Sequence, residues 1–233
     1  MFLSACGPTH TWHQRLTITV ETPWGVRTGS SVTAVRWEEQ RIRLGEMPAL
    51  LQDTSGEAVV VDVRPDAPEG SPRYLFALTD VSGLAPGVMA PDGLVPGKKV
   101  RAMKRVKGPV AVPPDSLPRM VTFLDVNDPM SVVRIELTEA DGVRERREPK
   151  AGDWRAYGPS MTLADAFGHG VHLEHATIEL TDESVTDGPI NALLPWLPEH
   201  YGQRLDGQRF GNIETASPVA NSLSSGSFDT ERN

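Results

Sequence analysis

Three histidines spaced by three residues, His169, His172 and His175, are the first candidates for metal binding or acid–base chemistry. Residues 171–180 follow a glycine and mix apolar with polar types, which predicts a strand on which His172 and His175 face opposite sides. His172 and Glu174 then share one face, and a tetrahedral metal there would need ligands from elsewhere in the chain. No metal or other cofactor is therefore expected. If the protein did bind a metal ion, His172 and Glu174 would be the candidate ligands.

An oxygen-rich turn occupies residues 125–129, which read Asp-Val-Asn-Asp-Pro. The turn resembles the calcium-binding linker of cadherins, because calcium takes oxygen ligands. The other acidic motifs of such a site are missing, and Asn and Asp also stabilise turns by bonding to their own backbone. A structural turn is the main prediction. The alternative is a periplasmic metal-dependent hydrolase that uses His172 and Glu174 with Asp125 or Asp128.

Other catalytic patterns are not found in the sequence. The glycine-containing stretch 93–99 lacks the spacing of a phosphate-binding loop and the Ser or Thr that follows its lysine. No Gly-x-Ser-x-Gly elbow occurs. The single cysteine excludes an intramolecular disulfide and a Cys-based zinc site. The sequence therefore favours a protein without catalysis of its own.

The only cysteine, Cys6, ends the sequence Leu-Ser-Ala-Cys, which resembles the lipobox where bacterial lipoprotein signal peptides are cleaved. A thiol is the nucleophile that takes up a diacylglycerol group. Only Met1, Phe2 and Leu3 precede the box, whereas a signal peptide has a basic start and about 7–15 apolar residues. Residues 1–6 are therefore expected to be the remnant of a longer signal peptide. A cytosolic binding protein that starts at Met1 is the alternative.

One stretch of the chain, residues 98–107 (the basic segment), is strongly positive although the net charge of the protein is −8. Its six basic residues are Lys98, Lys99, Arg101, Lys104, Arg105 and Lys107. A solvated strand face is the simpler interpretation, and contact with anionic lipid headgroups or an acidic partner is the functional one. The negative net charge argues against a nucleic-acid partner.

Composition indicates a β-rich fold that positions these groups. Gly and Pro contribute 21 and 20 of the 233 residues, well above their usual joint share of about 12%. Many short segments joined by turns are typical of an antiparallel sandwich or barrel, so we expect one such domain with two or three short helices. We expect the core to contain Leu16, Ile18, Val20, Val60, Phe76, Val121, Phe123 and Ile178.

Several local patterns support this fold. Alternation over 16–20 predicts a strand, and Thr-Pro-Trp-Gly at 22–25 predicts a turn. A second strand over 26–37 changes phase near 29–31, which suggests a bulge. A hairpin is expected over 56–80, and Thr162 with Asp165 is expected to cap a short helix.

The chain divides into three parts after the presumed signal peptide. Residues 7–14 are expected to be a tether, residues 15–210 the β domain, and residues 211–233 a disordered tail rich in Ser and Asn.

Residues 119–134 resemble the VTF-D-NDP-SV signature of a bacterial, mainly proteobacterial, family of uncharacterised exported proteins and presumed lipoproteins. Residues 163–180 and 180–197 are similar to the same family, as are Trp12-His13-Gln14, Leu16-Thr17 and Glu21-Thr22-Pro23. The resemblance covers most of residues 12–205 and implies export, but it brings no established activity or catalytic residue.

These observations together predict a cell-envelope protein anchored by lipid on Cys6 at the periplasmic face of a bacterial membrane. Its expected partners are the membrane itself and an envelope protein or other envelope component. Its expected role is binding or assembly.

Overall fold

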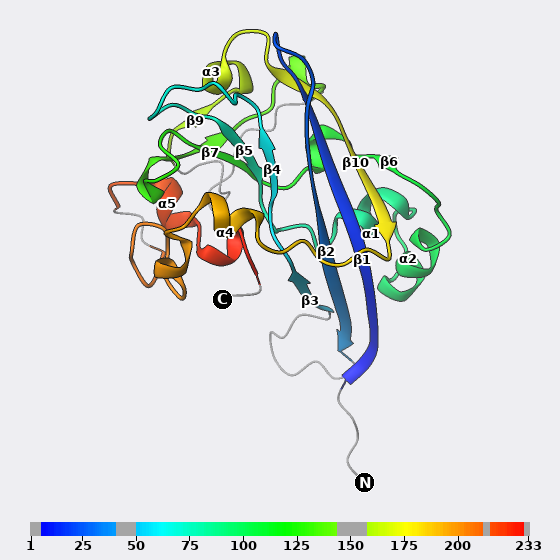
Figure 1. Ribbon diagram of the computed structural model, residues 1–233. Coiled ribbons are helices and arrows are strands. Elements are labelled where there is room, and N and C mark those ends of the chain that lie inside the picture. Colours follow the sequence, from blue (N-terminus) through cyan, green and yellow to red (C-terminus); the bar gives the residue numbers. More distant parts are fainter. Residues whose placement is uncertain (1–5, 41–49, 144–157, 212–214, 231–233) are drawn as a thin grey trace.

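The computed structural model describes residues 6–40, 50–143, 158–211 and 215–230, and in these residues two five-stranded sheets form a sandwich-like domain (Figure 1). The first sheet has the order β3-β2-β1-β10-β6, and all its neighbouring strands are antiparallel. The second has the order β4-β5-β7-β8-β9, and only β8 and β9 are parallel. The predicted mainly β, sandwich-like fold is confirmed, and the sheets do not close into a barrel.

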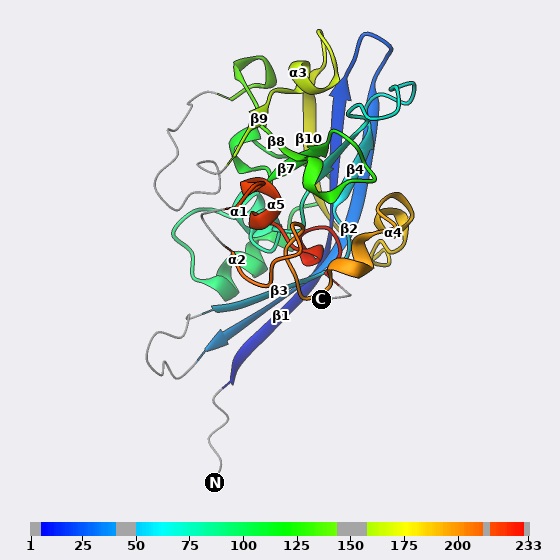
Figure 2. The same ribbon diagram turned by 90° about the vertical axis from the view of Figure 1, so that its left-hand side faces the viewer.

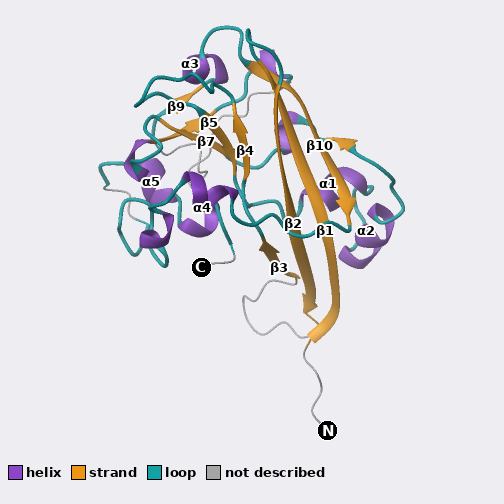
Figure 3. Ribbon diagram, in the orientation of Figure 1, coloured by secondary structure: helices purple, strands orange, loops and turns teal. Residues whose placement is uncertain are grey.

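The strands of the first sheet are β1 (Cys6–Glu21), β2 (Arg27–Gln40), β3 (Leu50–Ser55), β6 (Val110–Ala111) and β10 (His172–Thr181). Those of the second are β4 (Val59–Asp62), β5 (Tyr74–Ala77), β7 (Met120–Phe123), β8 (Val132–Ile135) and β9 (Ser160–Met161). The helices described are α1 (Leu84–Met89), α2 (Pro96–Met103), α3 (Leu163–Phe167), α4 (Pro189–Leu193) and α5 (Pro218–Ser222). All are short, and in Figure 3 they lie around the sheets.

Local patterns formed the elements that they predicted. The turn at 22–25 is closed by a hydrogen bond from the Gly25 amide to the Thr22 carbonyl (3.0 Å). The α3 helix is capped reciprocally: the Thr162 hydroxyl accepts from the Asp165 amide (3.1 Å), and the Asp165 carboxylate accepts from the Thr162 amide (3.2 Å). The Thr162 hydroxyl also donates to the Asp165 carboxylate (2.8 Å), and this hydrogen bond, together with that from the Thr162 amide, lowers the pKa of Asp165.

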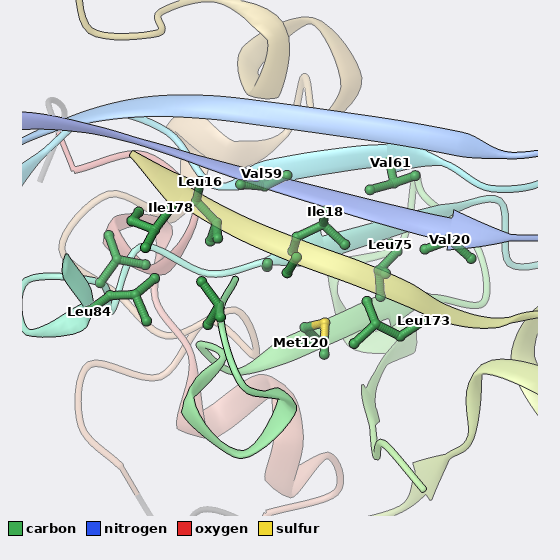
Figure 4. Packing of buried hydrophobic residues seen from close by; sticks show 14 of the residues in the cluster. Leu16, Ile18, Val20, Val59, Val61, Leu75, Leu84, Met120, Leu173 and Ile178 are labelled. Atoms are coloured by element: carbon green, nitrogen blue, oxygen red, sulfur yellow. The ribbon is translucent and has the colours of Figure 1, made fainter. Parts of the chain in front are cut away.

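The main core lies between the two sheets. Leu16, Ile18 and Val20 of β1 form one buried cluster with Val59, Val61, Leu75 and Met120 of the second sheet, and Figure 4 shows these side chains together. Of the eight predicted core residues, seven are buried, and Val60 is only partly buried, on the outer face of β4, an edge strand of the second sheet.

The second sheet is also covered on its outer face, by the chain after β10 (Figure 2). Phe76, Val121 and Phe123 point away from the first sheet and pack against Val219, Leu223, Phe228 and other apolar residues of the C-terminal part. Burial on both faces explains why β5 and the valines of β4 form apolar runs rather than alternating with polar residues.

The expectation of a disordered tail over 211–233 is wrong for its described part. Residues 215–230 contain α5 and bury Val219, Ala220, Leu223 and Phe228. The amide of Ala58 donates to the Phe228 carbonyl (2.8 Å). The segment is rich in Ser, but its few apolar residues pack on the outer face of the second sheet. Residues 212–214 and 231–233 lie outside the described residues.

The expectation of a tether over 7–14 is also wrong. These residues belong to β1 and pair with β2, for example Trp12 with Val35. The Trp12 indole is buried and meets Trp37 edge to face, with ring centroids 5.4 Å apart. Backbone pairing and this aromatic contact fix the segment in the sheet.

Gly29 is explained by a close approach of the two sheets and not by the expected bulge. The β1–β2 register runs without interruption from Arg27 to Val35. A Cβ atom at Gly29 would lie 1.9 Å from the Val60 carbonyl oxygen of β4. Only glycine lets β4 approach this position.

We expect Gly29→Ala to lower the free energy of unfolding by about 1–3 kcal/mol, since the backbone of β4 must move. Gly87→Ala is the matched control: it lies within α1 with nothing within 4 Å of its added methyl, and should be neutral or stabilise by up to about 1 kcal/mol. Urea denaturation of both variants measures the difference. Equal stabilities would contradict the packing argument.

Candidate functional site

The predicted histidine group does not assemble into a metal site. The β1–β10 register shifts between Thr19 and Val20, which pair with His175 and Leu173, so Glu174 is an extra residue on β10. Leu173 and Ala176 are buried, whereas His172, Glu174 and His175 are partly or fully exposed. The expected opposition of His172 and His175 is therefore wrong, because the bulge changes the phase.

The side chains around this bulge form ordinary surface pairs. His172 Nε2 lies 3.3 Å from a carboxylate oxygen of Glu21, and His175 Nδ1 lies 3.8 Å from one of Glu174. Within the described ranges, no group of three or more His, Cys, Asp or Glu side chains is arranged to hold a metal ion.

The turn at 125–129 forms the predicted hydrogen bonds to its own backbone. Asp125 Oδ1 accepts from the Asn127 amide (2.9 Å), and Asp128 Oδ1 accepts from the Met130 amide (2.8 Å). The Ser131 hydroxyl lies 2.7 Å from the carbonyls of both Asp125 and Asp128. The turn is thus held by its own polar groups.

The same turn lines a cavity at one end of the second sheet. Since β4, β5, β7 and β8 are antiparallel neighbours, the β4–β5 loop (63–73) and the β7–β8 loop (124–131) meet at one end of it. Between them is a cavity of about 180 Å³. Its lining includes Tyr74, Phe76 and Phe123, Glu69 and Ser71 from the first loop, and Asp125 and Asn127 from the second.

Charge at the cavity is set by one ion pair and two further acids. Arg73 donates twice to Asp62 (2.9 and 2.6 Å), and this bond raises the pKa of Arg73. The Arg73 guanidinium also lies 4.8 Å from the centre of the Tyr74 ring. The arginine is therefore balanced by Asp62, and the carboxylates of Glu69 and Asp125 leave the lining negative.

Sequence reasoning found only part of this cavity. Asp125 and the turn were singled out, but Glu69, Arg73 and Tyr74 were not. The proline-rich loop between two apolar strands could have indicated these three residues. A long hairpin loop lies next to the other loops at the same end of the sheet, so its residues can line a shared cavity.

The basic segment begins as a helix, so the expectation of a solvated strand face is wrong for that part. Val100 and Met103 of α2 are buried against the core, which leaves Lys98, Arg101 and Lys104 exposed. Exposed Arg105 and Lys107 follow the helix, and Lys99 is half-buried. No acidic residue occurs from 93 to 114, and none of the six basic side chains forms an ion pair with a described residue.

Contacts place the basic segment beside the first half of β1. Lys104 Nζ donates to the Thr11 carbonyl (3.1 Å). Gly97 lies against the His10–Glu39 pair, whose side chains are 3.2 Å apart. Val95, at the start of the helix, is 59% exposed.

Cys6, the predicted lipidation site, is the first residue of β1 and pairs with Gln40 of β2. Residues 1–5 of the expected signal-peptide remnant, 1–6, lie outside the described residues. No described helix has the length and apolar character needed to cross a bilayer.

The described residues form a β-sandwich-like domain that carries a small acidic cavity at one end of the second sheet and a basic surface beside β1. Comparison with protein-family models, curated proteins and solved structures finds no match for this chain.

Proposed function

We propose that this protein is a lipid-anchored cell-envelope protein, held through Cys6 at the periplasmic face of a bacterial membrane, and that it works as a binding or assembly module. The observation that carries the proposal is the position of Cys6 beside a basic surface. Cys6 and residues 98–107 are far apart in the sequence, yet α2 contacts β1 only four or five residues after Cys6. The resemblance to exported bacterial proteins supports the same location.

The distance between Cys6 and the basic segment would let both contact one membrane surface at the same time. Four or five strand residues correspond to about 13–16 Å, at about 3.3 Å per residue. A modest tilt of β1 would bring Lys98, Arg101 and Lys104 within a Debye length of anionic headgroups. Each such charge contributes about 1 kcal/mol near an anionic surface, and Val95 adds an apolar contact. Two or more acyl chains on Cys6 would supply the stable anchor.

This anchor would present the cavity away from the bilayer. Figure 1 shows that β1 begins at one end of the molecule and turns into β2 at the other. Arg64, in the loop that lines the cavity, lies 5.9 Å from the ring centre of Trp24 at that far turn. Fifteen residues of β1 separate the two ends, or about 50 Å.

The anchor is tested by expressing the full reading frame, including codons upstream of Met1. We expect the membrane fraction to contain a mature chain that starts at Cys6 with acyl chains, seen by mass spectrometry of the N-terminal peptide. Cys6→Ser should move the protein to the soluble fraction. Unmodified Cys6 preceded by Ala5 in membrane-free protein would contradict the proposal and favour the cytosolic alternative.

The basic surface is tested separately, on soluble Cys6→Ser protein. Lys98→Glu with Arg101→Glu should strongly reduce sedimentation with vesicles of phosphatidylglycerol, because two attractive charges become repulsive. The matched control reverses two arginines away from α2 and the first half of β1, Arg64→Glu beside the far turn and Arg209→Glu in the C-terminal part. Equal binding of both double variants would remove the basic segment from the proposal without affecting the anchor.

A further inference from the structure

The cavity between the β4–β5 and β7–β8 loops carries an inference that does not depend on the anchor. We propose that it binds a positively charged group, an ammonium or guanidinium, carried on a short apolar stem. The guest is either a free amine or the basic side chain of a partner protein, since both present the same chemistry.

The size and floor of the cavity suit such a stem. Its volume of about 180 Å³ is below the range of about 300–1,000 Å³ that holds drug-sized ligands, so one side chain or a small amine fits. Phe76 and Phe123 form an apolar floor with ring centroids 5.6 Å apart. Tyr74 stands beside them, 6.3 Å from Phe76. Phe76 and Phe123 are almost fully buried and the Tyr74 ring already carries the Arg73 guanidinium, so the rings offer the guest an apolar wall for its stem.

The polar part of the lining selects the sign of the charge. Arg73 is already bonded at two positions to Asp62, so it does not attract an anion as a free arginine would. Asp125 directs one carboxylate oxygen to the Asn127 amide, and Glu69 is exposed on the opposite loop. With the Arg73–Asp62 pair neutral, two carboxylates on facing loops attract a cation between them.

The loops are also fixed in place, so the cavity is present before a guest arrives. The Trp196 indole donates to the Val126 carbonyl (2.8 Å) and meets Phe123 edge to face. The Ser71 amide closes a turn on the Pro68 carbonyl (3.1 Å). A preformed cavity avoids the ordering cost that weakens binding by mobile loops.

The test is an NMR titration of ¹⁵N-labelled protein with n-butylammonium, and with n-butanol and pentanoate as neutral and anionic analogues. We expect saturable shifts of the Gly70, Ser71 and Asn127 amides with the cation, with a Kd on the order of millimolar. The two analogues should shift these amides much less. Equal binding of butanol or pentanoate would overturn the proposal.

Variants that remove one negative charge test whether Asp125 and Glu69 attract the bound cation. Asp125→Asn and Glu69→Gln should each weaken butylammonium binding about fivefold. The Asn side chain can still accept from the Asn127 amide, so the turn is kept. Asp92→Asn, at an exposed acid near α2, is the matched control and should leave the Kd unchanged. An unchanged Kd in Asp125→Asn and Glu69→Gln would overturn the proposal.

A second titration identifies the source of the cation. The probe is a blocked Gly-Lys-Gly peptide, which carries the ammonium on a peptide backbone. Tighter binding than butylammonium assigns the cavity to a basic side chain of a partner protein. Weaker binding of the peptide assigns it to a free amine.

Discussion

Phe228→Ala is expected to lower the free energy of unfolding by about 3–5 kcal/mol, as large buried aromatic side chains do when truncated. Phe228 is fully buried, and its ring lies 5.8 Å from Phe76 and 5.7 Å from Phe123. It therefore completes the outer core of the second sheet. Chemical denaturation monitored by tryptophan fluorescence measures the loss.

A chain that ends at Gly211 extends this prediction to the whole C-terminal segment. It lacks Val219, Leu223 and Phe228, and it leaves the Ala58 and Thr79 amides without the carbonyls that they reach in residues 227 and 228. We expect loss of cooperative unfolding or a large fall in Tm. Phe210→Ser is the control, because that ring is 73% exposed and should change stability little. A truncated chain as stable as the full chain would show that the segment does not contribute to the fold.

Glu57→Ala has the second largest expected effect, a loss of about 2–4 kcal/mol. The Glu57 carboxylate is buried and accepts from the amides of Gly188 (2.8 Å) and Ile190 (3.1 Å) at the start of α4. The Ile190 amide is buried, and a buried donor left without a partner costs about 1–3 kcal/mol, whereas the Gly188 residue is exposed. Truncation of the buried Glu57 side chain also leaves a cavity. Glu21→Ala, an exposed acid paired with His172, is the control and should change stability by less than about 1 kcal/mol.

Glu57 also predicts a pH dependence. Burial raises its pKa above the ordinary value of 4.5, assisted by the negative charges of Asp229 and Asp187 and opposed by the amide hydrogen bonds. The folded protein therefore holds this proton to higher pH than the unfolded chain does. The resulting stabilisation is fully present below pH 4.5 and is lost as the pH rises through the folded pKa.

Comparison with Glu57→Gln isolates this proton. The Gln side chain does not titrate, so the free energy of unfolding of wild type minus that of the variant should be highest below pH 4.5 and should fall as the pH rises through the folded pKa of Glu57. Urea denaturation at a series of pH values measures it. If wild type instead gains stability relative to the variant as the pH rises, the amide hydrogen bonds outweigh burial and the pKa of Glu57 is lowered.

The sequence by itself determined the features that rest on neighbouring residues. The alternation of Leu16, Ile18 and Val20 decides which face of β1 is buried, because successive strand residues point to opposite sides. The turn at 22–25 and the cap formed by Thr162 and Asp165 are closed by hydrogen bonds within four residues. Hydrogen bonds between residues so close in the chain do not depend on where distant segments lie. The turn and the cap could therefore be predicted from the sequence, and both predictions are confirmed.

Only the tertiary structure decided the features that join distant segments. Phe228 is ordered because the outer face of the second sheet needs a cover, and Gly29 is required because the Val60 backbone passes beside it. The bulge at Glu174 arises from pairing with β1, and it places His172 and His175, expected on opposite faces, on the same face of the sheet. The cavity exists because antiparallel pairing brings the loops that carry Glu69 and Asp125 to one sheet end. Each of these depends on contacts between residues far apart in the chain, which residue type and spacing along the chain do not encode.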